Sequence, residues 1–184
     1  MNPLLLSIDT GLATGGAALI DLYNKQVIDV LLLTTEKSVR KREVSVSSDT
    51  MNRAKLYARV LQRFIAPYSN IRGIVHESLS LPRNARAAAL IGISLGVVAD
   101  IAEQRNCPLI EVSPQNVKLG VTGKKTASKD EVIQAVLNHQ PELEPAFKQR
   151  GPAGKWEHMA DAVAVGLSAW DHDIVRLLRA GSGA

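Results

Sequence analysis

The sequence is poor in cysteine, in aromatic residues and in long apolar runs. A single cysteine, Cys107, among 184 residues excludes an intramolecular disulfide and fits a reducing compartment. Two tryptophans, three tyrosines and two phenylalanines, most at positions typical of a core, argue against an aromatic platform for single-stranded nucleic acid. The longest apolar stretch, residues 87–102, is interrupted by Ser94 and Asp100, and we expect it to be too short to cross a bilayer.

We do not expect the first ten residues to form a targeting segment. The start, MNPLLLSIDT, lacks positive charge and is interrupted by Asp9, so it does not resemble a signal peptide. Hydrophobic residues make up 46% and charged residues 22%, the balance of a globular protein. We therefore expect a soluble protein of the cytoplasm (the host cytoplasm if phage-encoded) with no membrane partner. The net charge of +4 is a mild indication of a polyanionic partner.

The apolar pattern predicts three strands followed by alternating helices and strands. Strands are expected at residues 4–8, 17–22, 27–33, 71–76 and 109–112. Helices are expected at 48–66, 87–104, 114–119, 129–138 and 155–170, with a loop over 139–154. This order predicts an α/β fold with a five-stranded mixed sheet, three antiparallel strands and then two after helical crossovers, and helices on both faces. One domain over residues 1–180 and a frayed tail over 181–184 complete the prediction.

Three features that can bind metal fall at the ends of predicted elements. Asp9 ends the first strand, Glu77 ends the fourth, and His158 and Asp161 share one face of the last helix. If the two strands are neighbours, these side chains converge at one edge of the sheet. Carboxylates that lie so near one another repel each other unless cations lie between them. Their hard oxygen atoms suit Mg²⁺.

Each of these residues also has an ordinary interpretation. Asp9 before Thr-Gly fits an Asx turn, Glu77 fits a solvated loop edge, and His158 fits a packed surface histidine. Asp161 is the hardest to explain in this way, because an aspartate between apolar helix residues is costly unless it is paired or bound to metal. The four together point to function more strongly than any one of them.

Four segments in order, SIDTG, HES, SPQNVKLGVTGKKTASKDEV and HMADAVAVG, resemble the RuvC family of Holliday-junction resolvases over residues 3–168. The resemblance implies an RNase H-like fold and an endonuclease that resolves four-way junctions, and other branched DNA, by symmetric two-metal hydrolysis to 5′-phosphate and 3′-hydroxyl ends. It implies that Asp9, Glu77, His158 and Asp161 hold two Mg²⁺ ions, with Mn²⁺ as a substitute. It also implies a homodimer through the helix at 87–104. A branch-migration motor accompanies cellular members, but the sequence shows no docking surface for one.

Basic residues surround the predicted site. The resemblance places Lys118 and Lys129 at the scissile phosphate or the DNA backbone, with Lys129 also catalytic; Gln115 and Asn116 share their motif. Residues predicted to contact DNA are Arg40, Lys41, Arg42, Arg83, Arg86, Lys118, Lys124, Lys125 and Lys129. Residues 78–81 carry no aromatic ring where bacterial members stack one on a base, which favours broader cutting of branched DNA.

Three alternatives stay open on the sequence. Another RNase H-like nuclease, acting on RNA–DNA hybrids or flaps, would need the same acidic residues. A sugar-kinase or actin-like ATPase shares the Asp-x-Gly start, but it needs two lobes, a longer chain and a second phosphate loop. A non-catalytic junction-binding protein would gain nothing from clustered acids that face phosphate.

Overall fold

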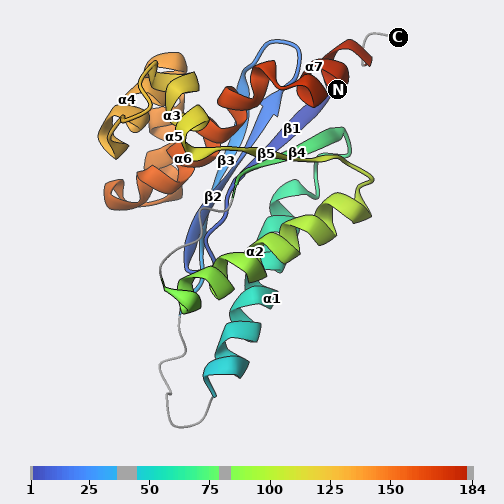
Figure 1. Ribbon diagram of the computed structural model, residues 1–184, viewed down its shortest axis with the longest axis vertical. Helices are drawn as coiled ribbons and strands as arrows, with labels where there is room; N and C mark the ends of the chain where they lie inside the picture. Colours follow the sequence, from blue (N-terminus) through green and yellow to red (C-terminus); the bar gives the residue numbers. More distant parts are fainter. Residues whose placement is uncertain (1, 37–44, 79–83, 182–184) are drawn as a thin grey trace.

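A five-stranded mixed sheet forms the centre of the structure, a computed structural model that describes residues 2–36, 45–78 and 84–181 (Figure 1). The strands are β1 Leu4–Asp9, β2 Thr14–Asp21, β3 Val27–Thr34, β4 Ile71–Glu77 and β5 Leu109–Val112. Their order across the sheet is β3-β2-β1-β4-β5. The first three strands are antiparallel, and β4 and β5 run parallel to β1. The predicted α/β architecture is thereby confirmed.

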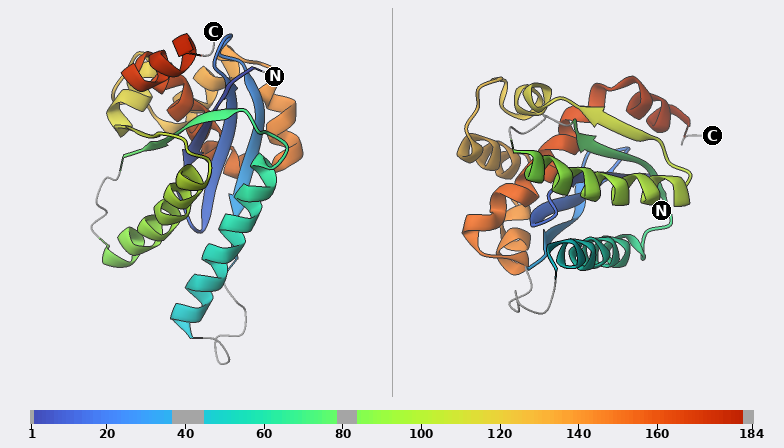
Figure 2. Two further views of the ribbon diagram at one scale, coloured as in Figure 1. Left: turned by 90° about the vertical axis from the view of Figure 1, so that its right-hand side faces the viewer. Right: turned by 60° about the horizontal axis from the view of Figure 1, so that its bottom comes forward.

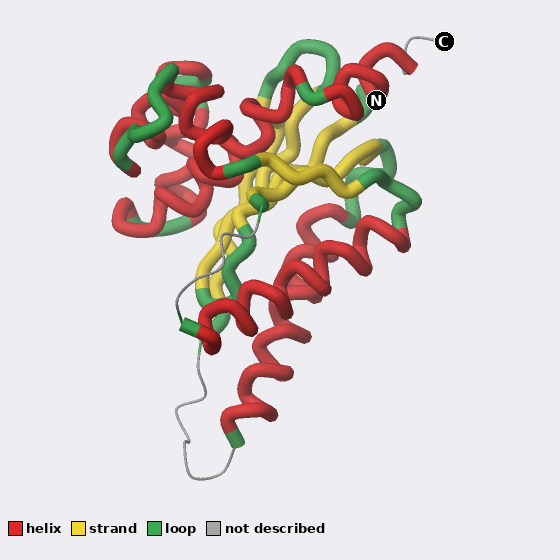
Figure 3. Tube along the Cα trace, in the orientation of Figure 1, coloured by secondary structure: helices red, strands yellow, loops and turns green. Residues whose placement is uncertain are grey.

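Helices cover both faces of the sheet (Figures 2 and 3). One face carries α1 Val46–Ile65 and α2 Ala85–Gln104, which contact each other. The other face carries α3 Pro114–Thr122, α4 Lys129–His139, α5 Leu143–Arg150, α6 Trp156–Ser168 and α7 Asp173–Ala180. Short 3₁₀ turns at Ala153–Lys155 and Ala169–Asp171 flank α6.

The pleat of β1 divides the apolar residues between two cores. Leu4, Leu6 and Ile8 face α1 and α2, whereas Leu5 belongs to the core that contains α6. Successive side chains of a strand point to opposite faces, so Asp9 shares the face of Leu5 and lies on the α6 side. The same alternation in β4 places Glu77 with Val75, which also packs in the α6 core. The strands therefore present both carboxylates to one helix.

Small residues let α6 lie directly on the sheet. A Cβ atom on Gly16 of β2 would stand 2.0 Å from the backbone oxygen of His158, and one on Gly166 would stand 2.3 Å from Ile20. The hydroxyl of Ser7 donates a hydrogen bond to the backbone oxygen of Ala162. Gly16 of β2 is also the cross-strand partner of Asp9 on β1. The close contact at Gly16 therefore holds the end of β1, which carries Asp9, near α6, which carries His158 and Asp161.

The prediction of a loop over residues 139–154 is wrong, because α5 lies inside it. Leu143 and Phe147, four residues apart, are buried on one side of the helix, and Phe147 packs edge-to-face on Trp156 with ring centroids 6.0 Å apart. Pro145 lies in the first turn, where its missing N–H costs nothing. The prolines that suggested a loop are therefore compatible with a short helix.

Other element boundaries also differ from the prediction. The side chain of Ser45, not that of Ser48, caps α1 by accepting a hydrogen bond from the backbone N–H of Ser48. The final helical region is split, because α6 ends at Ser168 and α7 follows over Asp173–Ala180. Of the predicted tail, residues 182–184 lie outside the described residues.

The helix α2 is longer and more exposed than its sequence suggested. At 20 residues it is, by length and composition, able to cross a membrane, so the prediction that the stretch is too short is wrong. A single such helix is weak evidence of a span. Ser94, Val98, Ile101 and Ala102 are its only buried residues among those described. A Cβ atom on Gly92 or Gly96 would meet nothing within 4 Å, so these glycines do not serve packing on the chain's own sheet.

Candidate active site

Two neighbouring parallel strands bring Asp9 and Glu77 to one edge of the sheet. Ile8 of β1 is in register with His76 of β4, so the residues that follow them end the two strands side by side. The carboxyl ends of adjacent parallel strands are where α/β folds place their ligand sites. Both side chains are partly buried, on the face covered by α6.

The first turns of α6 complete the cluster. His158 Nδ1 lies 2.9 Å from Asp9 Oδ2, a hydrogen bond that joins α6 to β1 across 149 residues of sequence. Asp161, one turn further along α6, is partly buried on the same side. The four residues predicted from the sequence therefore converge on one edge of the sheet.

Electrostatic coupling shows how close these groups are to one another. Burial, together with the charges of Asp9 and Glu77, raises the pKa of Asp161 to about 7. Burial and the charge of Asp9 also raise the pKa of Glu77, which Lys118 partly offsets. The hydrogen bond to Asp9 raises the pKa of His158. The cluster thus holds more negative charge than its surroundings neutralise.

This donor set suits a hard divalent cation. Three carboxylates that repel one another and one imidazole are the groups whose repulsion such a cation relieves. Over residues 2–36, 45–78 and 84–181, however, no three His, Cys, Asp or Glu side chains stand close enough to hold one ion. The types of residue therefore fit a metal, and their side chains would have to move closer together to coordinate one ion.

Lys129 lies on the rim of the cluster in an ion pair that sequence reasoning missed. Its Nζ lies 2.6 Å from Glu157 Oε2, and Glu157 Oε1 lies 3.6 Å from His158 Nε2. Asp9 and Asp161 are near enough to raise the pKa of Lys129 further, after the larger effect of the Glu157 hydrogen bond. The available sequence signal was the position of Glu157 directly before His158, on the turn that enters the site.

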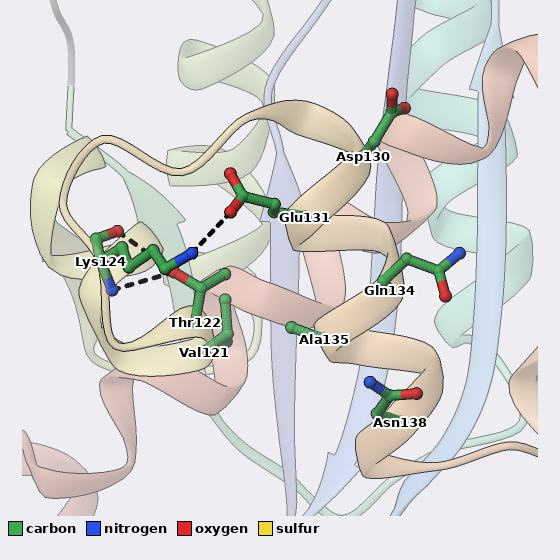
Figure 4. Close-up of a pocket in the computed structure, with 8 residues that line it drawn as sticks. All are labelled: Val121, Thr122, Lys124, Asp130, Glu131, Gln134, Ala135 and Asn138. Carbon is green, nitrogen blue, oxygen red and sulfur yellow. Dashed lines mark hydrogen bonds and ion pairs between the residues drawn. The ribbon is translucent and has the colours of Figure 1, made fainter.

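The remaining predicted DNA contacts are spread over several elements. Lys118 of α3 is near enough to Glu77 to lower its pKa. Lys124 pairs with Glu131 at 2.9 Å beside a hollow between the end of α3 and α4 (Figure 4). Lys125 and Arg86, the latter in the first turn of α2, are exposed. Arg40, Lys41, Arg42 and Arg83 lie outside the described residues.

A mixed sheet in this strand order, flanked by helices and carrying acidic groups at the ends of two adjacent strands, defines the class of RNase H-like proteins. Residues 5–169 match the family model described as "Crossover junction endodeoxyribonuclease RuvC". The chain belongs to this family of structure-selective, Holliday-junction endodeoxyribonucleases of DNA recombination. Membership implies dependence on a divalent metal.

The chain resembles curated members of the family over most of its length. It is 28% identical over 174 residues to the RuvC of Synechococcus sp. (strain CC9605), covering 90% of this chain and 97% of that relative. It is 31% identical over 135 residues to the RuvC of Alkaliphilus oremlandii (strain OhILAs), covering 72% of this chain and 76% of the relative.

Solved structures of resolvases share the fold. The RuvC of T. thermophilus in complex with Holliday junction substrate superposes with a TM-score of 0.67 at 18% identity, covering 92% of this chain and 94% of that one. The yeast mitochondrial Holliday junction resolvase Ydc2 gives a TM-score of 0.61 at 17% identity, covering 99% and 85%. At these identities the likeness concerns the fold.

Proposed function

We propose that this chain binds four-way DNA junctions and other branched DNA and cuts them by hydrolysing phosphodiester bonds at the cluster of Asp9, Glu77, His158 and Asp161. The observation that supports the proposal is the hydrogen bond of Asp9 to His158, with Glu77 and Asp161 near enough to act on each other's charge, at one edge of the sheet in a member of the RuvC family. Residues 1–180 act as one nuclease domain. Its proposed place of action is the cytoplasm, or the host cytoplasm if the chain is phage-encoded.

Two Mg²⁺ ions, for which Mn²⁺ can substitute, are held by these four residues. Asp9 is central, because its charge acts on both Glu77 and Asp161 and its carboxylate contacts His158. Bound there, the ions would activate a water and offset the charge that develops on the phosphate. The water would bond to phosphorus and the 3′-oxygen would leave, which gives a 5′-phosphate and a 3′-hydroxyl. The raised pKa values of Glu77 and Asp161 support the proposal, since bound cations would favour the charged form of both carboxylates.

The remaining roles fall to residues that orient groups or contact phosphate. The hydrogen bond between His158 Nδ1 and Asp9 fixes the imidazole ring, whose other nitrogen, Nε2, lies 3.6 Å from Glu157 Oε1. Lys129, at the rim, offsets negative charge on the scissile phosphate. Arg40, Lys41, Arg42, Arg83, Arg86, Lys118, Lys124 and Lys125 contact the DNA backbone, which gives affinity that falls steeply with salt.

A homodimer brings two such sites to one junction, and α2 supplies the interface. Its outward side carries the small residues Ala89, Gly92, Gly96 and Ala99, all exposed. Since a Cβ atom on either glycine meets nothing within 4 Å, a second helix can approach this side closely. A dimer interface would account for the apolar surface of α2, so that no membrane is needed to explain it.

The test is cleavage of labelled DNAs with Mg²⁺ or Mn²⁺ by the wild type and by Asp9→Asn. The panel contains a four-way junction, a three-way fork, a flap, a linear duplex and an RNA–DNA hybrid. Paired symmetric nicks in the four-way junction, absent with Asp9→Asn although binding persists, are the expected result. Equal cutting of forks and flaps would indicate a broader debranching nuclease, in keeping with the ring-free residues 78–81. Binding without cutting by the wild type would contradict the proposal.

A further inference from the structure

Glu157 lies between two groups that the proposed function uses. One carboxylate oxygen accepts a hydrogen bond from Lys129 Nζ at 2.6 Å, and the other stands 3.6 Å from His158 Nε2. The carboxylate is at the start of α6, and Lys129 is the first residue of α4. The pair therefore connects two helices whose N-terminal ends border the acidic cluster.

The surroundings of the pair differ from those of other lysine–glutamate pairs on this chain. Lys148 and Glu144 also pair, at 2.7 Å, but both belong to α5 and neither influences the acidic cluster. Glu157 is 28% exposed against 48% for Glu144, so it has less freedom to move. The Lys129 side chain itself is 70% exposed and, without an anchor, would sample many positions.

An ammonium group has three N–H donors, and Glu157 engages one of them. Two donors are left for a phosphate oxygen placed between Lys129 and the carboxylates. Glu157 does not need to release the lysine when DNA binds. Its negative charge also fixes the ammonium at the rim and keeps it from collapsing onto Asp161 or Asp9, both of which attract it.

We propose that Glu157 is a positioning residue, which holds the Lys129 ammonium at the rim of the acidic cluster so that two N–H donors face the scissile phosphate. The inference rests on the proposed function and adds to it a residue that acts through Lys129. Glu157 itself touches neither the phosphate nor the water. Its removal should therefore slow the chemical step and leave junction affinity almost unchanged.

The test measures single-turnover cleavage of a four-way junction and, separately, its affinity without divalent metal. Glu157→Ala is expected to lower the cleavage rate about tenfold, with affinity within about twofold. Glu157→Gln keeps an oxygen acceptor and should retain most of the rate. Glu157→Ala combined with Lys129→Ala should be no slower than Lys129→Ala alone. Glu144→Ala, which breaks the matched pair on α5, should change neither quantity.

A second readout does not depend on nuclease activity. Acylation of surface lysines, followed by mass spectrometry, should proceed roughly threefold faster at Lys129 in Glu157→Ala than in the wild type, with Lys148 as the internal reference. Unchanged labelling of Lys129 would overturn the inference, and so would normal cleavage by Glu157→Ala. If the rate losses of Glu157→Ala and Lys129→Ala multiply in the double variant, Glu157 acts independently of Lys129. That result would overturn the inference in favour of action through His158. A wild type that labels as expected but cuts no junction would refute the proposed function, and the positioning role with it.

Discussion

The two apolar helices α2 and α6 have similar composition and opposite environments. Both are rich in alanine, glycine and branched aliphatic residues. Eight of the 13 residues of α6 are buried between the sheet and the helices α3 and α4, whereas four of the 20 residues of α2 are buried. Small residues in α6 allow close contact with the chain's own strands, and those in α2 remain open on the outside. The same residue types thus hold the helix that carries two proposed ligands against the sheet in one region, and leave an open surface in the other.

The two helices also differ in how firmly their positions are fixed within one chain. The position of α6 is fixed through Gly16 and Ser7, directly beneath the residues that carry the proposed chemistry. The outward side of α2 has no comparable constraint within one chain. We therefore expect the two regions to respond in opposite ways to substitution, and the following predictions test that contrast from the largest effect to the smallest.

Asp161→Asn should reduce cleavage of a four-way junction by about 10³-fold, because it removes a charged ligand from the α6 side of the site. Junction binding should persist, since DNA affinity comes from the basic residues. Cleavage assays with saturating enzyme, alongside a gel-shift measurement, check this. Asp173→Asn, at the exposed start of α7, is the matched control and should cut normally. Full cleavage activity of Asp161→Asn would show that this residue of α6 is not part of the active site.

Gly16→Ala should lower the free energy of unfolding by about 2–3 kcal/mol, because the new Cβ would lie 2.0 Å from the backbone oxygen of His158 and force α6 off the sheet. Cleavage should fall with it as His158 moves from Asp9. In the monomeric chain Gly96→Ala should act in the opposite direction and raise the unfolding free energy by about 0.5–1 kcal/mol, since within one chain its Cβ meets nothing and alanine favours the helix. Urea denaturation measures both. Equal changes in the unfolding free energy of the two variants would contradict the expected difference between α6 and α2.

Without divalent metal, stability should fall as pH rises from about 4 to about 7. The pKa of Asp161 is raised from 3.8 to about 7 in the folded chain, so over this interval the folded state binds more protons than the unfolded state. Asp161→Asn should flatten this dependence, and added Mg²⁺ should oppose it in the wild type. Thermal unfolding at a series of pH values provides the measurement. A stability that rises across the interval in the wild type, and equally in the variant, would contradict the expected coupling.

Gly96→Glu should abolish self-association while the monomer stays folded, because the added side chain enters open space in one chain and an interface in the dimer. Analytical ultracentrifugation should show a wild-type dimer and a variant monomer. Circular dichroism of the variant should match that of the wild type. A wild type that stays monomeric at high concentration would leave the exposed side of α2 unexplained by dimerisation.

Tyr57→Phe should have the smallest effect, a gain of up to about 1 kcal/mol in unfolding free energy. Tyr57 of α1 is fully buried, and among the described residues its hydroxyl has no hydrogen-bond partner. Its face of the sheet carries none of the four proposed ligands, so cleavage should not change. Because Asp9 is close enough to raise the pKa of Tyr57, a loss of cleavage would show that the hydroxyl supports that carboxylate.

The sequence predicted best what depends on local pattern. Strand periodicity and the positions of Asp9 and Glu77 at strand ends place two carboxylates at one sheet edge once the strands are neighbours. The apolar setting of Asp161 marked it as unusual, and the structure places it near both carboxylates. The four proposed ligands could therefore be chosen without coordinates.

What the sequence could not predict depends on distant contacts. The helix α5 has only two large apolar side chains, Leu143 and Phe147, and Phe147 packs on Trp156. The pair between Lys129 and Glu157 joins residues 28 positions apart through flexible side chains. Whether Gly92 and Gly96 face the sheet or the outside depends on how α2 lies, which periodicity alone does not determine.

The hydrogen bond between Asp9 and His158 closes a loop of nearly the whole chain. During synthesis from the N-terminus, the central strands emerge early, but the helix that completes the site comes from the last fifth of the chain. A chain cut short before α6 would keep Asp9 and Glu77 and lack their partners. The proposed nuclease centre can therefore form only after residues up to Asp161 have been made, so that shorter nascent chains would lack two of the four proposed ligands.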